Sequence, residues 1–286
     1  MKQIIITVAV LLAFSIVSFA QSSDSVLRSV IEKDQTNRNA QGKLLTLPVG
    51  EHLSRAETYM SNRLFPQARE HWQQIIDNYP TDAAAMPKTL FGIARSYMWE
   101  RQYEKAVFWF DRLLKDYPNT KDGREGLAFK GASLVRMGKN AEAAQTYQQY
   151  VVMFPTGEKI ESAHLNIIDA LREAGKFDEA NLWVDKTRTR FAGMPVETNA
   201  LQARLRMEIS RANWEKAAQA ADEMIRLRNF SGSMSSADEA LYLKGFAFEK
   251  AGRRADAITV YTSIPDSFSS YYSGLATEKL KTLSHS

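Results

Sequence analysis

One short pattern returns along most of the chain. It reads QAREHWQQIIDNYP over residues 67–80, KAVFWFDRLLKDYP over 105–118 and EAAQTYQQYVVMFP over 142–155. In each copy an alanine is followed four residues later by an aromatic residue and twelve residues later by a proline. A period of this size is typical of proteins built from stacked repeats, because one repeat cannot bury its apolar face alone. We therefore expect a stack of similar units.

Alignment on the alanine extends the pattern to six copies, although the later copies are less regular. The alanines lie 38, 37, 37, 37 and 40 residues apart, at Ala68, Ala106, Ala143, Ala180, Ala217 and Ala257. In the fourth and fifth copies, Ala192 and Asn229 replace the closing proline. In the fifth copy Ala221 also replaces the aromatic residue, and Glu208 stands where a large apolar residue is expected. The sequence leaves the register of these two copies open.

Each copy predicts a pair of helices. Before the alanine, as in residues 90–106, apolar residues recur at spacings of three and four, which is the period of a helix with one buried face. Gly138, Gly175 and Gly252 stand where a helix ends in a left-handed residue. The closing proline ends the second helix because it cannot continue one, and the small residues let two helices cross closely. The pattern predicts an all-α solenoid of about six helical hairpins.

This arrangement resembles the tetratricopeptide repeat, whose unit has about 34 residues. The copies here are three to six residues longer than that unit. The expected layout is a signal peptide over 1–20, a helix and linker over 21–48, tetratricopeptide-like repeats over 49–270 and a capping helix over 271–286. The resemblance implies that the first helix of each hairpin lines a concave groove.

The chain starts with the pattern of a secretory signal peptide. Lys2 precedes an apolar run over residues 4–17, and small residues stand at Ser18 and Ala20. Signal peptidase accepts small residues at these two places, so we expect cleavage after Ala20 and a periplasmic or secreted mature protein. The alternative is a helix that stays in the membrane, but the run is short for a bilayer core of roughly 30 Å. No membrane contact is expected after cleavage.

Composition narrows the classes of partner. The chain has no cysteine, so an exported form has no disulfide framework and no lipid-anchoring cysteine at the cleavage site. Its stability must come from packing. The 37 Lys and Arg residues and the 33 Asp and Glu residues are spread along the chain rather than gathered in blocks. Together with export, this charge pattern argues against nucleic acid as a partner.

The sequence contains no convincing catalytic or metal-binding pattern. The histidines are scattered, and no pair shares the four-residue spacing and glutamate of a helical zinc site. They are interpreted as surface or interface residues, and they are His52, His71, His164 and His285. A nucleophile elbow and a phosphate-binding glycine loop are also absent from the sequence. We therefore expect no enzymatic activity, no cofactor and no metal.

A second resemblance concerns the whole layout. The signal peptide, the repeats ending in Tyr-Pro and the segment SYYSGLATEKL at 270–280 resemble the N-terminal superhelical part of the soluble lytic transglycosylases. Those periplasmic enzymes cleave peptidoglycan, and the resemblance implies an accessory scaffold of such an enzyme. Their catalytic glutamate lies in a Glu-Ser pair, which Glu161 and Ser162 match. This pair opens a repeat helix, however, and the family's glycine-led motif does not follow it, so Glu161 is not predicted to be catalytic.

The predicted groove contains candidate binding residues from successive repeats. Projection of the first helices places seven side chains in or near it, namely Arg95, Met98, Trp99, Arg136, Arg172, Arg206 and Tyr242. Guanidinium groups suit carboxylates, such as a peptide C-terminus or the carboxylates of a peptidoglycan stem. The alternative is that these arginines are solvated helix surface with acidic neighbours such as Asp169 and Glu173.

Two functions follow from these patterns. The first is an exported helical-repeat scaffold that binds an envelope protein or peptide in its groove. The second is the accessory superhelical domain of a lytic transglycosylase, with peptidoglycan or a separate catalytic domain as its partner. The sequence identifies neither the ligand nor the oligomeric state.

Overall fold

The repeated pattern folds into helices joined by short turns. The computed structural model describes residues 25–267 and 270–285. Within these ranges the regular elements are helices, apart from one isolated antiparallel bridge between Arg38 and Leu44. The predicted signal peptide, residues 1–20, lies outside the described residues. None of the described helices combines the length and the apolarity that crossing a bilayer requires.

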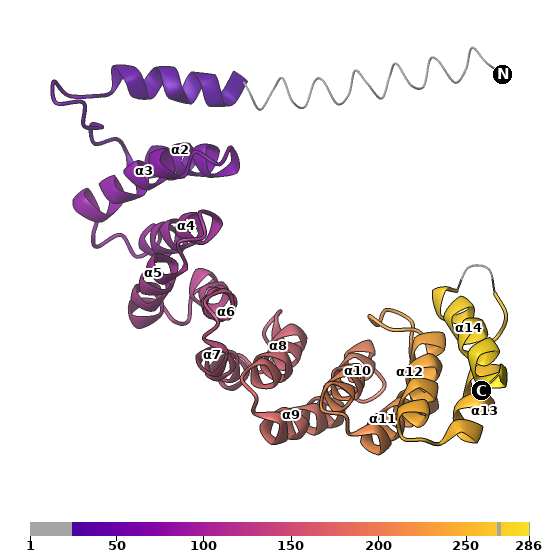
Figure 1. Ribbon diagram of the computed structural model, residues 1–286. Coiled ribbons are helices and arrows are strands. Elements are labelled where there is room, and N and C mark those ends of the chain that lie inside the picture. Colours follow the sequence, from indigo (N-terminus) through magenta and orange to yellow (C-terminus); the bar gives the residue numbers. More distant parts are fainter. Residues whose placement is uncertain (1–24, 268–269, 286) are drawn as a thin grey trace, which may run out of the picture. The chain divides into compact units, whose positions relative to one another are not determined.

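The chain divides into two compact units, residues 1–137 and 138–286. The first unit has a helix over residues 25–36, followed by α2 (Val49–Ser61), α3 (Phe65–Asn78), α4 (Met86–Trp99), α5 (Tyr103–Asp116) and α6 (Lys121–Arg136). The second unit contains α7 (Asn140–Met153), α8 (Ile160–Glu173), α9 (Phe177–Arg190), α10 (Pro195–Ser210), α11 (Trp214–Leu227), α12 (Ala237–Lys250), α13 (Arg254–Thr262) and α14 (Tyr271–His285). Figure 1 labels these helices along the chain.

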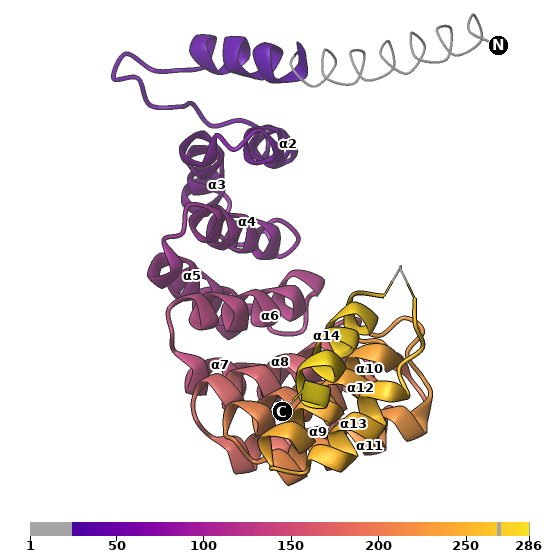
Figure 2. The same cartoon turned by 45° about the vertical axis from the view of Figure 1, so that its right-hand side comes forward.

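Within each unit, helices pack in the order expected for stacked hairpins. In the first unit α2 packs on α3 and α4 on α5, and α2 and α6 also contact α4. In the second unit α8 packs on α9, α10 on α11 and α12 on α13, while α8 also contacts α10. The last helix, α14, packs against both α12 and α13 (Figures 1 and 2). The predicted all-α, tetratricopeptide-like solenoid class is confirmed.

The small residues of the pattern lie where the helices cross. All six key alanines are 0% exposed, including Ala68 and Ala106. The aromatic residues four positions later are buried as well in the first two copies, with Trp72 and Phe110 at 0%. Contacts are so close that a Cβ on Gly92 would lie 2.3 Å from a ring carbon of Trp72. The helices cross so closely that only a small residue fits between them, which explains why the pattern repeats an alanine.

The ends of the helices follow the predicted signals. The second helices α3, α5 and α7 each end two residues before a closing proline of the pattern. In the second unit, α12 starts at a capping residue, because the Ser236 hydroxyl accepts a hydrogen bond from the backbone N–H of Glu239 at 3.1 Å. This hydrogen bond is the first half of a capping box, for which Ser236 and Glu239 have the required spacing.

The turn inside each hairpin uses one left-handed residue. At three of these turns the residue is the predicted glycine, and Gly138, Gly175 and Gly252 have φ of 73°, 73° and 76°. At the other three turns it is Arg63, Arg101 or Ala212, with φ of 61°, 60° and 57°. A side chain in this conformation costs roughly 1 kcal/mol, and a glycine avoids most of that cost.

Five of these turns share one hydrogen-bonding scheme. The residue after the left-handed position donates its backbone N–H to the carbonyl five residues earlier, as Leu64 does to Tyr59 at 2.9 Å. Lys176 donates in the same way to Leu171, also at 2.9 Å. This 6→1 bond is that of a Schellman motif, so the arginine turns and the glycine turns are structurally equivalent.

Candidate functional site

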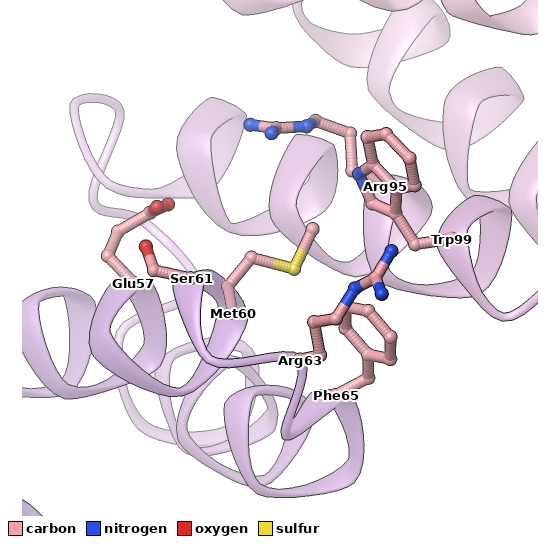
Figure 3. A pocket seen from close by; sticks show the side chains of 7 residues that line it. All are labelled: Glu57, Met60, Ser61, Arg63, Phe65, Arg95 and Trp99. Carbon is pink, nitrogen blue, oxygen red and sulfur yellow. The ribbon is translucent and has the colours of Figure 1, made fainter. Parts of the chain in front are cut away.

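Trp99, the last residue of α4, is an unusually exposed aromatic side chain at 52%. It lies between two hollows of the first unit, with volumes of about 250 and about 520 Å³. The smaller hollow, shown in Figure 3, is lined by Glu57, Met60, Ser61, Arg63, Phe65, Arg95 and Trp99. The larger hollow is lined by Arg63, Met98, Trp99, Arg101, Tyr103, Phe129, Ala132 and Arg136. We call these lining residues together the Trp99 site.

Four arginines meet at the Trp99 site from two kinds of element. Arg95 and Arg136 come from the first helices α4 and α6, whereas Arg63 and Arg101 are the left-handed turn residues. In Figure 3 the Arg63 side chain points towards Trp99, and Arg95 extends across the opposite side of the hollow. None of the four forms an ion pair with a residue in the described ranges.

The environment of Arg95 shows how little of this charge is neutralised. Its Nε is buried without a hydrogen-bond partner among the described residues, and its guanidinium lies 5.4 Å from the centre of the Phe91 ring. Glu57 is the acidic residue in the lining of the smaller hollow. The lining of the larger hollow contains no acidic residue among the described ones. The site therefore carries a net positive charge beside apolar and aromatic side chains.

This combination suits a ligand with an anionic group next to an apolar one. Guanidinium groups bind carboxylates through paired, charge-assisted hydrogen bonds. Exposed aromatic faces such as that of Trp99 offer a large apolar contact area for a neighbouring side chain. The Trp99 site presents guanidinium groups and an aromatic face side by side, because Arg63 and Trp99 line both hollows.

The structure brings together the predicted groove residues of the first unit. Arg95 and Trp99 line one hollow, and Trp99, Met98 and Arg136 line the other. The turn arginines were not predicted, because only first-helix residues are expected in the groove. A signal was nevertheless present, since the alignment puts arginines at turn positions that hold glycine in other copies.

The predicted arginines of the second unit have acidic partners. Arg172 pairs with Asp169 at 3.3 Å and with Glu173 at 2.9 Å. Arg206 pairs with Glu239 at 2.8 Å. For Arg172, the partners are the two acidic neighbours that the alternative interpretation names. That all four predicted arginines share one surface stays a prediction.

Two further features of the second unit concern predicted residues. The half-buried Tyr242 ring has its centre 5.6 Å from those of Tyr261 and Tyr272, so it belongs to an aromatic cluster formed with α13 and α14. Glu161 is exposed in the first turn of α8, and the Ser162 hydroxyl donates to the Lys159 carbonyl at 3.0 Å. In the described part of the chain, no group of acidic, histidine or cysteine side chains is arranged to hold a metal ion.

A buried polar cluster joins the helix over residues 25–36 to the first hairpin. Asp34 pairs with Arg55 and accepts hydrogen bonds from Tyr59 at 2.6 Å and from His71 at 2.9 Å. Burial alone raises the pKa of Asp34, but the hydrogen bonds from Tyr59, His71 and Arg55 outweigh it and lower that pKa. The carboxylate therefore stays charged inside the unit.

The hydrogen bonds of this cluster fix the proton positions of two histidines. The Leu47 backbone N–H donates to Nε2 of His52 at 2.9 Å, so this nitrogen carries no proton. Nδ1 of His52 then donates to Nδ1 of His71 at 2.9 Å, and Nε2 of His71 donates to Asp34. Burial, with the charges of His71 and Arg55, lowers the pKa of His52 to about 4. Both rings act as neutral links between helices, which scattered positions in the sequence did not reveal.

Comparisons with known proteins agree with the helical repeats. Profiles of the tetratricopeptide repeat family match residues 88–120, 130–195 and 239–270. These residues carry tetratricopeptide repeats. No curated protein matches the chain in sequence.

Two solved structures are similar in fold. MamA (residues 41 to the end) from Desulfovibrio magneticus has 15% sequence identity and a TM-score of 0.50, covering 66% of this chain and 97% of that one. A tetratricopeptide repeat protein from Parabacteroides merdae has 13% identity and a TM-score of 0.50, covering 93% of this chain and 94% of that one. At such low identity the likeness establishes the fold alone.

Proposed function

We propose that the protein is an exported helical-repeat scaffold that binds a protein or peptide partner in the cell envelope. The observation that carries this proposal is the Trp99 site, where four arginines that pair with no carboxylate in the described part of the chain surround an exposed tryptophan. Exposed charges without partners contribute little to stability, whereas a cluster of them attracts an anionic partner.

The chemistry of the site favours a polypeptide as that partner. The hollows are the size of single side chains or short segments, at about 250 and about 520 Å³. Their walls combine cationic groups with Met60, Phe65 and Phe129, and a peptide can present carboxylates and apolar side chains side by side. The repeated hairpins provide a rigid support for such contacts.

Export is the second part of the proposal and rests on residues 1–20. The apolar run and the small residues Ser18 and Ala20 support a cleaved signal peptide. The test is N-terminal sequencing of protein from the periplasmic fraction, which should start at Gln21. Recovery of intact Met1 in the membrane fraction would show instead that the segment is retained.

Peptide binding is tested by selection from a library of displayed random heptapeptides, using the mature protein as the target. Enriched peptides should bind the wild-type protein and the Leu182→Ala variant equally, because Leu182 is an exposed apolar residue of the second unit at 62%. They should bind the Trp99→Ala variant at least tenfold more weakly, since the largest apolar contact is lost. No enrichment, or equal binding to all three proteins, would refute binding at this site.

The accessory domain of a lytic transglycosylase is the second candidate function. The segment over 270–280 supports it, because Tyr271 at the start of α14 is 73% exposed and offers contact area to a neighbouring domain. The reading frame beyond Ser286 tests this candidate. Continuation into a Glu-Ser pair and a GLMQ-like stretch would favour it, and a stop codon followed by unrelated sequence would favour the scaffold.

A further inference from the structure

The left-handed turns of the hairpins differ in a way that folding does not explain. Three turns use glycine, one uses Ala212, and the first two use Arg63 and Arg101. All belong to the same position of the repeat, directly after the first helix of a hairpin. Glycine is the residue that adopts this conformation without a penalty, so a side chain here needs another reason.

Contacts within the chain supply no such reason for the two arginines. Neither guanidinium forms a hydrogen bond or an ion pair with any residue that the structure describes. Both side chains are exposed. By contrast, Arg69 in the same unit pairs with Glu100 at 2.8 Å and donates to the Ser96 hydroxyl at 3.0 Å.

Both turn arginines lie at the Trp99 site. Arg63 lines both hollows, and Arg101 lines the larger one together with Trp99 and Arg136. Backbone conformations that cost free energy are often retained where they place a side chain at a binding site. Arg63 points towards the exposed Trp99 at the end of α4, and Arg101 follows Trp99 by two residues.

We infer that Arg63 and Arg101 are ligand-binding residues, and that they select an acidic peptide segment with an apolar side chain next to its carboxylates. This inference rests on the proposed function and names the partner of the same site. Charge complementarity carries the choice of ligand, because the four arginines that surround the hollows have no acidic partner among the residues of the two described ranges. The apolar side chains in the walls of the hollows favour a peptide over a flat anionic lipid surface, which would engage cations on a protruding face.

The inference predicts a composition for the selected peptides. Heptapeptides enriched on the mature protein should contain at least two acidic residues beside an aromatic or aliphatic one. Replacing their Glu and Asp by Gln and Asn should weaken binding at least tenfold, because the charge-assisted hydrogen bonds are lost. Binding should also weaken as salt is raised, since exposed charges are screened.

The decisive variants replace the turn arginines by glycine, the residue that other copies use. Arg63→Gly and Arg101→Gly should each weaken binding of an enriched peptide about tenfold, and the double variant about a hundredfold, through lost charged hydrogen bonds. Their melting temperatures should stay equal to that of the wild type or rise, because the left-handed conformation suits glycine. Ala212→Gly is the control, since it places a glycine at an equivalent turn of the second unit, and it should leave binding unchanged.

The outcomes separate this inference from the function on which it rests. If Trp99→Ala abolishes binding but the double glycine variant binds like the wild type, the site binds peptides and the inference about the turns is wrong. If no heptapeptide is enriched, the proposed function itself fails. If the wild type binds vesicles of phosphatidylglycerol but no acidic peptide, and the double variant loses vesicle binding, the arginines bind an anionic lipid and the peptide assignment is overturned.

Discussion

The two units use the arginines of their first helices in opposite ways. In the first unit, Arg95 and Arg136 project from first helices and have no acidic partner among the described residues. In the second unit, Arg172 and Arg206 also project from first helices, but each pairs with carboxylates at 2.8–3.3 Å. An arginine on a first helix is therefore not enough to make a binding site, because its neighbours decide whether the charge is available to a ligand.

The first unit also contains both extremes of arginine environment. Arg55 is buried and pairs with Asp34 and Glu51, whereas Arg63 and Arg101 are exposed and unpaired within the described residues. A buried ion pair is costly to break, whereas an exposed charge contributes little to folding. Stability and binding should consequently depend on different arginines of one unit.

The largest effect is expected from Asp34→Asn. This change leaves Arg55 buried without its most enclosed partner, and breaking such a pair costs on the order of 3 to 5 kcal/mol. Amide hydrogen exchange should rise in α2 and α3 and stay unchanged in α8 to α14. Glu70→Gln serves as the control, because its pair with Arg38 is about one-third exposed on both sides and should cost roughly 1 kcal/mol or less.

The next largest effect is expected from acidification, which should lower the stability of the first unit more than that of the second. The neutral His52 has a pKa of about 4, below its ordinary value of 6.5, so the unfolded chain takes up the proton first as the pH falls. Stability is therefore lost between about pH 6.5 and 4, by up to roughly 1.4 kcal/mol per pH unit for each proton. Burial lowers the pKa of His71 as well, while the second unit has His164, whose pKa burial lowers to about 4.

The first unit, with two such histidines, should thus lose stability more steeply than the second, with one. Protection factors from hydrogen exchange at pH 7 and pH 5 measure this in both units of the same sample. A decline of equal size in the two units would show that the cluster around Asp34 does not control the acid response.

Overpacking the helix crossings should have a smaller, local effect. Ala106→Leu in the first unit and Ala217→Leu in the second each force a larger side chain into a crossing where the alanine is 0% exposed. The expected cost is roughly 1 to 3 kcal/mol. Ala141→Leu, at an exposed position of α7, is the control and should be nearly neutral. Hydrogen exchange that rises equally in both units for either core variant would contradict independent local packing.

Much of the fold could be predicted because its causes are local. The alanine recurs where helices cross, and Gly175 stands where the chain must turn left-handed, so both leave a mark in the sequence. Glu208 was harder to interpret, because an acidic residue stood at an expected apolar position. In the structure it is buried and accepts hydrogen bonds from Asn181 at 3.1 Å and Asn213 at 2.7 Å. The burial of Glu208 therefore depends on hydrogen-bond partners that lie 27 and 5 residues away in the sequence.

The candidate site was predicted only in part, for a related reason. Arg95, Trp99 and Arg136 follow from the helical projection, since their spacing places them on first helices. Arg63 and Arg101 stand at a position whose conformational role was recognised, but whose side chains were not considered as ligand contacts. The contact between His52 and His71 forms only when two helices pack together, so no local sequence pattern indicates it.

The smallest effects on folding are expected when a single exposed arginine is replaced, and they should differ between paired and unpaired arginines. Arg136 is exposed and forms no ion pair with a described residue, so Arg136→Ala should leave the melting temperature unchanged. Arg206→Ala removes a partner of Glu239, whose side chain is only 7% exposed. Because the Arg206 side chain is itself 56% exposed, the expected cost is modest, roughly 0.2 to 1 kcal/mol.

Binding should rank these two variants in the reverse order. Arg136→Ala removes a charge from the Trp99 site and should weaken an enriched acidic peptide about tenfold, with a smaller salt dependence than the wild type shows. Arg206→Ala should bind that peptide like the wild type, because the Arg206 guanidinium already forms an ion pair with Glu239. Calorimetric melts and fluorescence titrations on the same two preparations give both rankings. If Arg206→Ala weakens the peptide as much as Arg136→Ala does, pairing within the second unit does not withdraw its arginines from binding, and the contrast between the units is wrong.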